Sequence, residues 1–223
     1  MQYRLQHEIE RLKKQILTLG AMVEERLHQA VDAVIERDDR LARRVIEGDV
    51  EIDSLEVDLE EECLKLLALH QPVAIDLRFI IAVLKINNDL ERIGDLVVNI
   101  SERAATLAVQ PPIPTPFDYR PMADKVKHML KQSLDALVNM DAALALEVCR
   151  MDDEVDEMHA SVFRWVEATT LDQPEKISIL LHMQGISRHL ERIADLATNI
   201  AEDVVYMVQG RIVRHRMESC RTS

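Results

Sequence analysis

Acidic residues recur at helical spacing in two nearly identical stretches of the chain, 100 residues apart. Both stretches read Leu-Glu-Arg-Ile-(Gly/Ala)-Asp-Leu, and an asparagine and a second glutamate follow in each. Counted from the first glutamate, the polar residues stand at i, i+4, i+8 and i+11, which lie along one face of an α-helix. They are Glu91, Asp95, Asn99 and Glu102 in the first stretch and Glu191, Asp195, Asn199 and Glu202 in the second. Oxygen donors along one helix face are suited to binding a cation.

A second acidic motif precedes each of these stretches and contains two aspartates four residues apart. The aspartates are Asp49 and Asp53 in the first copy and Asp152 and Asp156 in the second. In an antiparallel helix pair, residues equidistant from the turn lie level with each other. The midpoints of the two motifs average to position 72, which is Pro72, and in the second copy to a point beside Pro174. The sequence therefore predicts that each copy brings two acidic pairs to one height on neighbouring helices.

Four carboxylates at one level repel each other, and their pKa values rise unless a cation neutralises them. All-oxygen ligation without paired histidines favours iron, manganese, magnesium or calcium over a closed structural zinc site. His159 follows Asp156 at i+3 and is either a further ligand or a surface histidine. The alternative to a metal is that the acids lie on solvated faces or are neutralised by Arg92 and Arg192. The matched heights in two copies favour the metal site.

Apolar residues at intervals of three, four or seven predict long amphipathic helices and no strands. Five of the seven prolines stand between positions 111 and 121, which indicates a linker. We therefore predict an all-α fold of two tandem antiparallel three-helix bundles related by internal duplication. The expected helices are 3–36, a second from the turn at 37–40 to His70, 73–107, one beginning at 122, 144–170 and 175–208. The expected divisions are a first bundle at 1–108, a linker at 109–121, a second bundle at 122–210 and a basic tail at 211–223.

Composition excludes several classes of protein. The formal net charge of −13 disfavours binding to nucleic acid or to anionic lipid. The longest apolar run, Phe79 to Leu84, is far shorter than the roughly 20 residues that cross a bilayer, and the first residues lack a secretory signal. Cys63, Cys149 and Cys220 are too widely spaced for a CxxC metal site. A cytoplasmic protein without membrane insertion is expected.

The chain resembles the PhoU family of phosphate transport system regulatory proteins from its first helix through Gly210. The resemblance is carried by Gln71-Pro72-Val73-Ala74-Ile75-Asp76-Leu77-Arg78, by the two Glu-Arg-Ile-(Gly/Ala)-Asp motifs and by the tandem organisation. It implies two three-helix bundles in a homodimeric cytoplasmic regulator. The implied partners are the cytoplasmic ATPase of a Pst-type phosphate ABC transporter and a phosphate-sensing histidine kinase, with which the protein holds the phosphate-starvation response off.

The resemblance also implies iron or zinc clusters at paired acidic motifs. Here those motifs are Asp49 and Asp53 with Glu91 and Asp95, then Asp152 and Asp156 with Glu191 and Asp195. Many relatives have histidine directly after the last aspartate, where this chain has Leu96 and Leu196. Position 88 is asparagine, whereas its counterpart is Arg188, whose guanidinium could take the place of a metal.

Two functions remain open from the sequence. One is a non-enzymatic adaptor with acidic metal-binding patches, which fits the absence of a paired nucleophile and base, of a Gly-rich phosphate loop and of a dinucleotide fingerprint. The other is a carboxylate-bridged metalloenzyme, an oxidase or hydrolase using two metals. An enzyme needs a concave and partly dry pocket, whereas an adaptor's patch can lie open on the surface.

Overall fold

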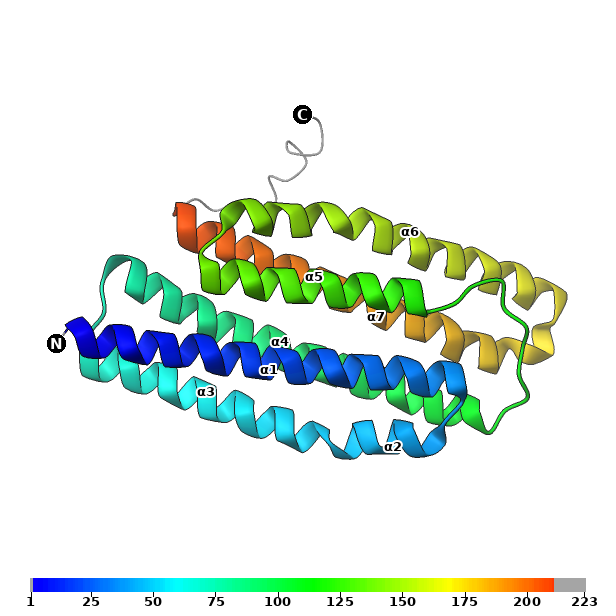
Figure 1. Cartoon of the computed structure of the whole chain (residues 1–223). Coiled ribbons are helices and arrows are strands. Elements are labelled where there is room, and N and C mark those ends of the chain that lie inside the picture. The colour runs from blue at the N-terminus through cyan, green and yellow to red at the C-terminus, as the bar shows by residue number, and fades with distance from the viewer. Residues whose placement is uncertain (1, 211–223) are drawn as a thin grey trace.

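The computed structural model describes residues 2–210, and within that range the chain is helical without any strand (Figure 1). α1, α3 and α4 form one antiparallel bundle, and α5, α6 and α7 form a second bundle beside it, as the sequence predicts. The elements are α1 (Gln2–Glu36), α2 (Asp39–Glu47), α3 (Asp49–His70), α4 (Ala74–Ala108), α5 (Arg120–Asn139), α6 (Ala142–Asp172), the 3-10 turn η1 (Pro174–Lys176) and α7 (Ile177–Gln209).

The single helix expected between the first turn and His70 is wrong, because Gly48 divides it into α2 and α3. The guanidinium of Arg26 on α1 lies against this glycine. A Cβ at position 48 would stand 2.6 Å from Arg26 Nη2, which no side chain could occupy without moving the arginine. Arg26 also pairs with Glu51 at 2.7 Å. A contact from another helix therefore accompanies the break.

Equivalent residues begin α2 and α6. Asp38 accepts hydrogen bonds from the backbone N–H groups of Arg40 and Leu41, and Asp141 accepts them from Ala143 and Leu144. Such caps satisfy N–H groups that have no partner inside the helix. Gly210 ends α7 in the left-handed conformation, with φ of 66°, which glycine adopts without a Cβ penalty.

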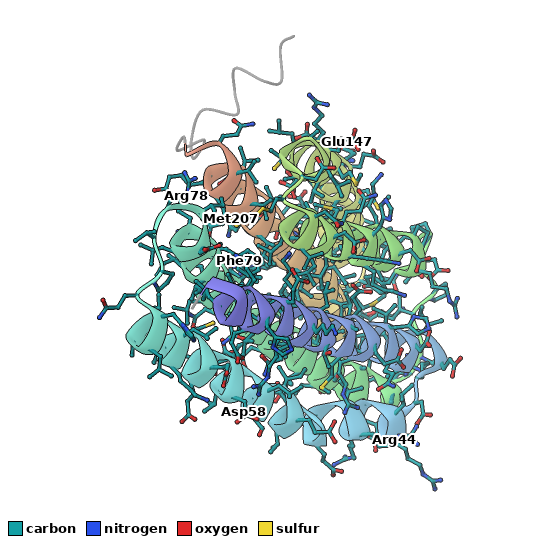
Figure 2. All side chains as sticks on the ribbon, turned by 60° about the vertical axis from the view of Figure 1, so that its left-hand side comes forward. Arg44, Asp58, Arg78, Phe79, Glu147 and Met207 are labelled. Atoms are coloured by element: carbon teal, nitrogen blue, oxygen red, sulfur yellow. The ribbon has the colours of Figure 1, made fainter. Side chains whose placement is uncertain are left out.

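The two bundles share one hydrophobic core. Buried apolar residues form a continuous cluster that includes both repeats, and α4 and α7 pack directly against each other at its centre. Figure 2 shows Phe79 and Met207 lying among the helices, whereas Arg44, Asp58 and Glu147 point outward. Within residues 2–210, no helix carries a stretch both long and apolar enough to span a lipid bilayer.

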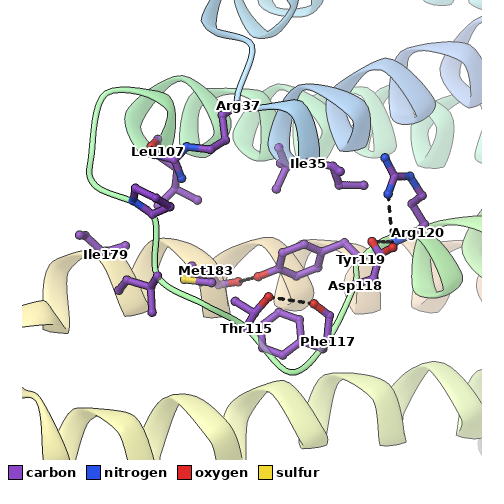
Figure 3. Close-up of a pocket in the computed structure, with 13 residues that line it drawn as sticks. Ile35, Arg37, Leu107, Thr115, Phe117, Asp118, Tyr119, Arg120, Ile179 and Met183 are labelled. Carbon is purple, nitrogen blue, oxygen red and sulfur yellow. Dashed lines mark hydrogen bonds and ion pairs between the residues drawn. The ribbon is translucent and has the colours of Figure 1, made fainter.

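The connection between α4 and α5 lies against both bundles rather than apart from them. Arg37, just after α1, donates hydrogen bonds to the carbonyl oxygens of Leu107 and Gln110. The buried hydroxyl of Tyr119 donates to the carbonyl oxygen of Met183 on α7 at 2.7 Å (Figure 3). These contacts fix the proline-rich segment at both of its ends.

Aromatic packing fixes the middle of the same connection. The Phe117 ring stands edge-on to Tyr119 and to Trp165 of α6, each at 5.2 Å between ring centroids. A hollow of about 340 Å³ remains beside it, between the ends of α1 and α4 and the start of α7 (Figure 3). Its walls are mainly apolar, with Val34, Ile35, Ile113 and Ile179 among them.

Candidate functional site

The first-repeat acidic patch lies where α3 and α4 pack together. Asp49 opens α3, and its Oδ1 atom lies 3.3 Å from where a Cβ on Gly94 of α4 would stand. Two turns further towards the hairpin, Asn87 of α4 donates a hydrogen bond to the carbonyl oxygen of Glu56 at 2.9 Å. These pairs are equidistant from the turn after His70, so the predicted apposition of Asp49 and Asp53 with Glu91 and Asp95 is observed.

The carboxylates of this patch act on each other. Burial raises the pKa of Asp49, and the neighbouring charges of Asp53 and Asp95 raise it further, while Arg26 opposes them. Burial likewise raises the pKa of Glu91, followed by Asp95 and Glu56. The patch therefore carries negative charge that the surrounding cations do not balance.

Glu56 is a fifth member of the patch that the sequence reasoning did not propose. Its pKa is raised by burial and then by Glu60 and Asp53, and its Oε1 accepts a hydrogen bond from Asn87 Nδ2 at 3.1 Å. It stands three residues after Asp53, as His159 stands three after Asp156. The equivalence of Glu56 to His159 could have identified Glu56 from the sequence.

The second-repeat acidic patch brings Asp156 of α6 together with Glu191 and Asp195 of α7. Burial raises the pKa of Glu191, as do Asp195 and Asp156, whereas Arg188 and Arg192 lower it. Burial is also the main reason why the pKa of Asp195 is raised, followed by Asp156. This patch therefore has cationic neighbours at close range, and the expected proximity of Arg188 to Glu191 is observed.

His159 lies at the edge of the second patch. Its Nδ1 atom is 3.0 Å from Ser187 Oγ, and the ring is half-buried. Burial and then Arg188 lower the pKa of His159, while Asp156 opposes them. The neutral imidazole is therefore favoured, which leaves a ring nitrogen able to accept or to bind a cation.

The remaining predicted site residues continue along the helices beyond these patches. Asn99 Nδ2 donates to the carbonyl oxygen of Asp95 at 2.7 Å, and Glu102 is exposed one turn further along α4. Burial raises the pKa of the Cys149 thiol to about 12, and the negative charges of Glu202 and Asp152 contribute to that rise. Asp152 and Glu202 are therefore neighbours of Cys149.

The donor set suits a hard cation, but the side chains do not converge as ligands. Across residues 2–210, no three His, Cys, Asp or Glu side chains form a group that could hold a metal ion. Chemistry and charge therefore fit a metal at Asp49, Asp53, Glu91 and Asp95, whereas coordination geometry is absent. The metal ligands and the identity of the ion remain predictions.

A groove of about 350 Å³ between α4 and α7 is lined by the same four residue types from both repeats. Because α4 and α7 run in opposite directions, equivalent residues face each other around a local pseudo-twofold axis (Figure 1). The lining residues are Arg92, Asp95, Leu96 and Asn99 with Arg192, Asp195, Leu196 and Asn199. The sequence repeat identifies these pairs, but only the packing of α4 on α7 places them together.

Known proteins match both repeats of the chain. The family described as the PhoU domain matches residues 16–104 and 119–204. The phosphate-specific transport system accessory protein PhoU homolog of Aquifex aeolicus (strain VF5) is 39% identical over 209 residues, which cover 94% of this chain and 95% of that protein. The homolog of the same name from Pseudomonas putida is also 39% identical over 209 residues, covering 93% and 82%.

Solved structures agree with this result. The crystal structure of PhoU from Pseudomonas aeruginosa has a TM-score of 0.86 at 38% identity, over 92% of this chain and 99% of that one. The phosphate transport system regulatory protein PhoU from Streptococcus pneumoniae has a TM-score of 0.88 at 29% identity, over 94% and 99%. The likeness therefore extends over the whole architecture and not only over the acidic motifs.

Proposed function

Because this chain belongs to the PhoU family, we propose that it is a regulatory accessory protein of a phosphate transport system. It acts in the cytoplasm as a non-enzymatic adaptor and holds the phosphate-starvation response off when phosphate is plentiful. Its partners are the cytoplasmic ATPase of a phosphate ABC transporter and a phosphate-sensing histidine kinase. The observation that carries the proposal is the match along almost the whole chain to accessory proteins of phosphate-specific transport.

An exposed apolar ridge on α3 supports an adaptor role. Val50, Val57 and Leu64 stand seven residues apart on one face of the helix and are 70%, 49% and 53% exposed. We call these three residues the α3 ridge. Acidic residues surround it, and no basic residue occurs between positions 49 and 64. The acids are Asp49, Glu51, Asp53, Glu56, Asp58, Glu60, Glu61 and Glu62.

The second repeat keeps the acidic motif but not the α3 ridge. Asp49 and Asp53 correspond to Asp152 and Asp156, 103 residues later, and the buried Ile52 and Leu59 correspond to the buried Val155 and Val162. With the same offset, the positions of the α3 ridge are Asp153, Ala160 and Glu167. The bundle therefore packs without a ridge, and its presence in one repeat favours a docking role.

A cleft of about 550 Å³ between α1 and α3 borders the ridge at Leu64. Arg11 and Lys65 in its lining each lie 3.5 Å from a carboxylate oxygen of Glu62, so both cations already have an acidic partner. Asp58 and Glu61 add further negative charge to the lining. Charge complementarity therefore favours a basic amphipathic helix of a partner protein, with its apolar residues on the α3 ridge.

Replacing the α3 ridge with the residues of the second repeat tests this surface. Val50→Asp/Val57→Ala/Leu64→Glu should keep the fold and weaken recovery of the ATPase or the kinase in a pull-down at low salt. Leu171→Glu, at a leucine elsewhere that is 83% exposed, serves as the control and should bind like the parent. Equal recovery of parent and triple variant would remove the ridge from the proposal while leaving the regulatory role standing.

Deleting the gene tests the regulatory role itself. We expect phosphate-starvation genes to stay on in phosphate-rich medium in the deletion strain, and a copy of the parent gene to restore their shut-off. Normal shut-off in the deletion strain, with neither partner recovered by the parent protein, would rule out the adaptor. The metalloenzyme would then become the better hypothesis.

The proposal includes metal binding by the first-repeat acidic patch through Asp49, Asp53, Glu91 and Asp95. A multivalent cation such as iron, zinc, manganese or magnesium would remove the repulsion that raises the pKa values of Asp49 and Glu91. Asp53 and Asp95 are exposed, so the patch is open to solvent, which suits an adaptor better than an enzyme.

Thermal melting tests the metal. Added metal should raise the melting temperature of the parent, because a ligand held only by the folded state stabilises it. The variant Asp53→Ala/Asp95→Ala should show no such rise. A rise of the same size in both proteins would exclude this patch as the binding site.

A further inference from the structure

The two ends of the interface between α4 and α7 carry different charges. The internal repeat makes position 85 equivalent to 185 and position 103 equivalent to 203. At one end, Lys85 Nζ lies 3.2 Å from Oδ1 of the buried Asp203. At the other end, the equivalent residues are Gly185 and Arg103. A cation paired with an acid is thus replaced by a cation facing a glycine.

Arg103 lies close against the α7 backbone at that glycine. A Cβ at position 185 would stand 2.5 Å from Arg103 Cζ and 2.6 Å from its Nε, so the guanidinium occupies the space that Gly185 leaves. Arg103 Nε is buried and has no hydrogen-bond partner. Among the ion pairs of residues 2–210, none involves Arg103. A buried donor without an acceptor is costly and calls for an explanation.

Two histidines stand on either side of the same glycine. His182 precedes Gly185 by three residues and His189 follows it by four, so all three share one face of α7. Nδ1 of His182 and both ring nitrogens of His189 are buried without hydrogen-bond partners. Each imidazole carries at least one N–H whatever its charge. Three side chains therefore offer donors around one point.

The guanidinium of Arg103 supplies positive charge at this point, whereas burial lowers the pKa of His189 to about 4 and favours its neutral form. Burial lowers the pKa of His182, and the charge of Arg103 lowers it further, so the guanidinium acts on that ring. The chain as a whole carries a net charge of −13, so a local cluster of unmatched donors contrasts with the rest of the molecule. What the cluster lacks is an acceptor with negative charge.

We propose that Arg103, His182 and His189 form a binding site for a tetrahedral oxyanion of the phosphate type. A guanidinium binds such an anion through two parallel N–H···O hydrogen bonds, and the remaining oxygens can accept from the two imidazoles. The anion would pair with Arg103 at this end of the interface, as Asp203 pairs with Lys85 at the other end. Its source is either inorganic phosphate or the phosphate group of a monoester.

The test is a phosphate titration of the full chain in the presence of a chelator, so that no metal can hold the anion. We expect saturable heat in calorimetry and a shift of the Arg103 Nε–H resonance. Arg103→Gln should weaken phosphate binding about tenfold or more, since a hydrogen bond to a charged group contributes about 1.5–3 kcal/mol. Arg43→Gln makes the same charge change at an exposed arginine of α2 and should bind like the parent.

Gly185→Ala gives an independent variant that keeps every charged group. Its Cβ would displace the guanidinium, the flexible end of Arg103, whereas alanine is the better helix former by about 1 kcal/mol. The variant should therefore stay folded and still lose phosphate affinity. Absence of saturable binding by the parent, or equal affinities in Arg103→Gln, Gly185→Ala and Arg43→Gln, would overturn the site.

A second titration with O-phosphoserine separates the two sources. Tighter binding of inorganic phosphate would identify the free ion as the ligand, and tighter binding of O-phosphoserine would identify a phosphorylated group. Because the site consists of this chain's own residues, its test requires neither the ATPase nor the kinase. Failure here would therefore leave the proposed regulatory role untouched.

Discussion

Single residues make the two acidic patches unequal. Asn88 in the first repeat donates to the carbonyl oxygen of Leu84 on its own helix, whereas the equivalent Arg188 lies near Glu191 and His159. The first patch also has the acidic Glu56 where the second has His159. Coulomb repulsion from Arg188 opposes a bound cation. Any metal should therefore prefer the first patch.

Neutralising Glu91 should stabilise the metal-free protein at neutral pH. The pKa of Glu91 in the folded state lies above its ordinary value near 4.5. At a pH between the ordinary pKa and the raised pKa, the folded state therefore binds more protons than the unfolded chain. Stability contributed by this group is therefore lost as the pH rises through that window, and the penalty is complete above it. Glu91→Gln removes the penalty.

We expect Glu91→Gln to melt up to about 1 °C higher than the parent at pH 7 in chelator. Solvent screens this partly exposed carboxylate and limits the gain to a few tenths of a kcal/mol, and 1 kcal/mol corresponds to about 2–4 °C at this chain length. The gain should vanish below the ordinary glutamate pKa, where the parent's carboxyl is protonated in both states. Calorimetric melting across pH measures it. Glu102→Gln, an exposed acid further along α4, should show no gain, and an equal gain in both would refute the account.

At the scale of elements, contacts within one helix hairpin could be predicted from the sequence. Contacts that involve a helix from outside the hairpin could not. The level placement of Asp49 with Gly94 follows from counting residues to a turn, so the sequence contains it. The break at Gly48 involves Arg26 from α1, which no local pattern reveals. The cluster at Arg103 likewise requires knowing that α4 packs against α7.

Helix rise explains why the predicted acidic face is longer than the patch. At 1.5 Å per residue, Asn99 stands about 12 Å and Glu102 about 16 Å beyond Glu91 along α4. A shared face is therefore not a shared site. The same reasoning separates Glu202, which lies near Cys149, from Glu191. Periodicity predicted the direction of these side chains, whereas distance along the axis decides which of them meet.

At the scale of the whole molecule, the two repeats share one continuous hydrophobic core. The core runs without interruption from α1 through α4 and α7 into α5 and α6. Separating the repeats would expose apolar faces of α4 and α7 to water, at a cost of roughly 25 cal/mol per Å². The connection adds to this unity because Tyr119 and Phe117 pack onto α7 and α6.

Cutting the chain within that connection should therefore abolish cooperative folding of each half alone. We expect the fragments 1–112 and 113–223 to be helical but to lack a sharp melting transition when separate, because each leaves half of the shared core exposed. Mixed together, they should form a 1:1 complex that melts cooperatively. Circular dichroism and size-exclusion chromatography measure both results. If each fragment alone melted sharply near the melting temperature of the intact chain, the repeats would be independent domains. The packing of α4 against α7 would then no longer hold the residues of the anion site in place.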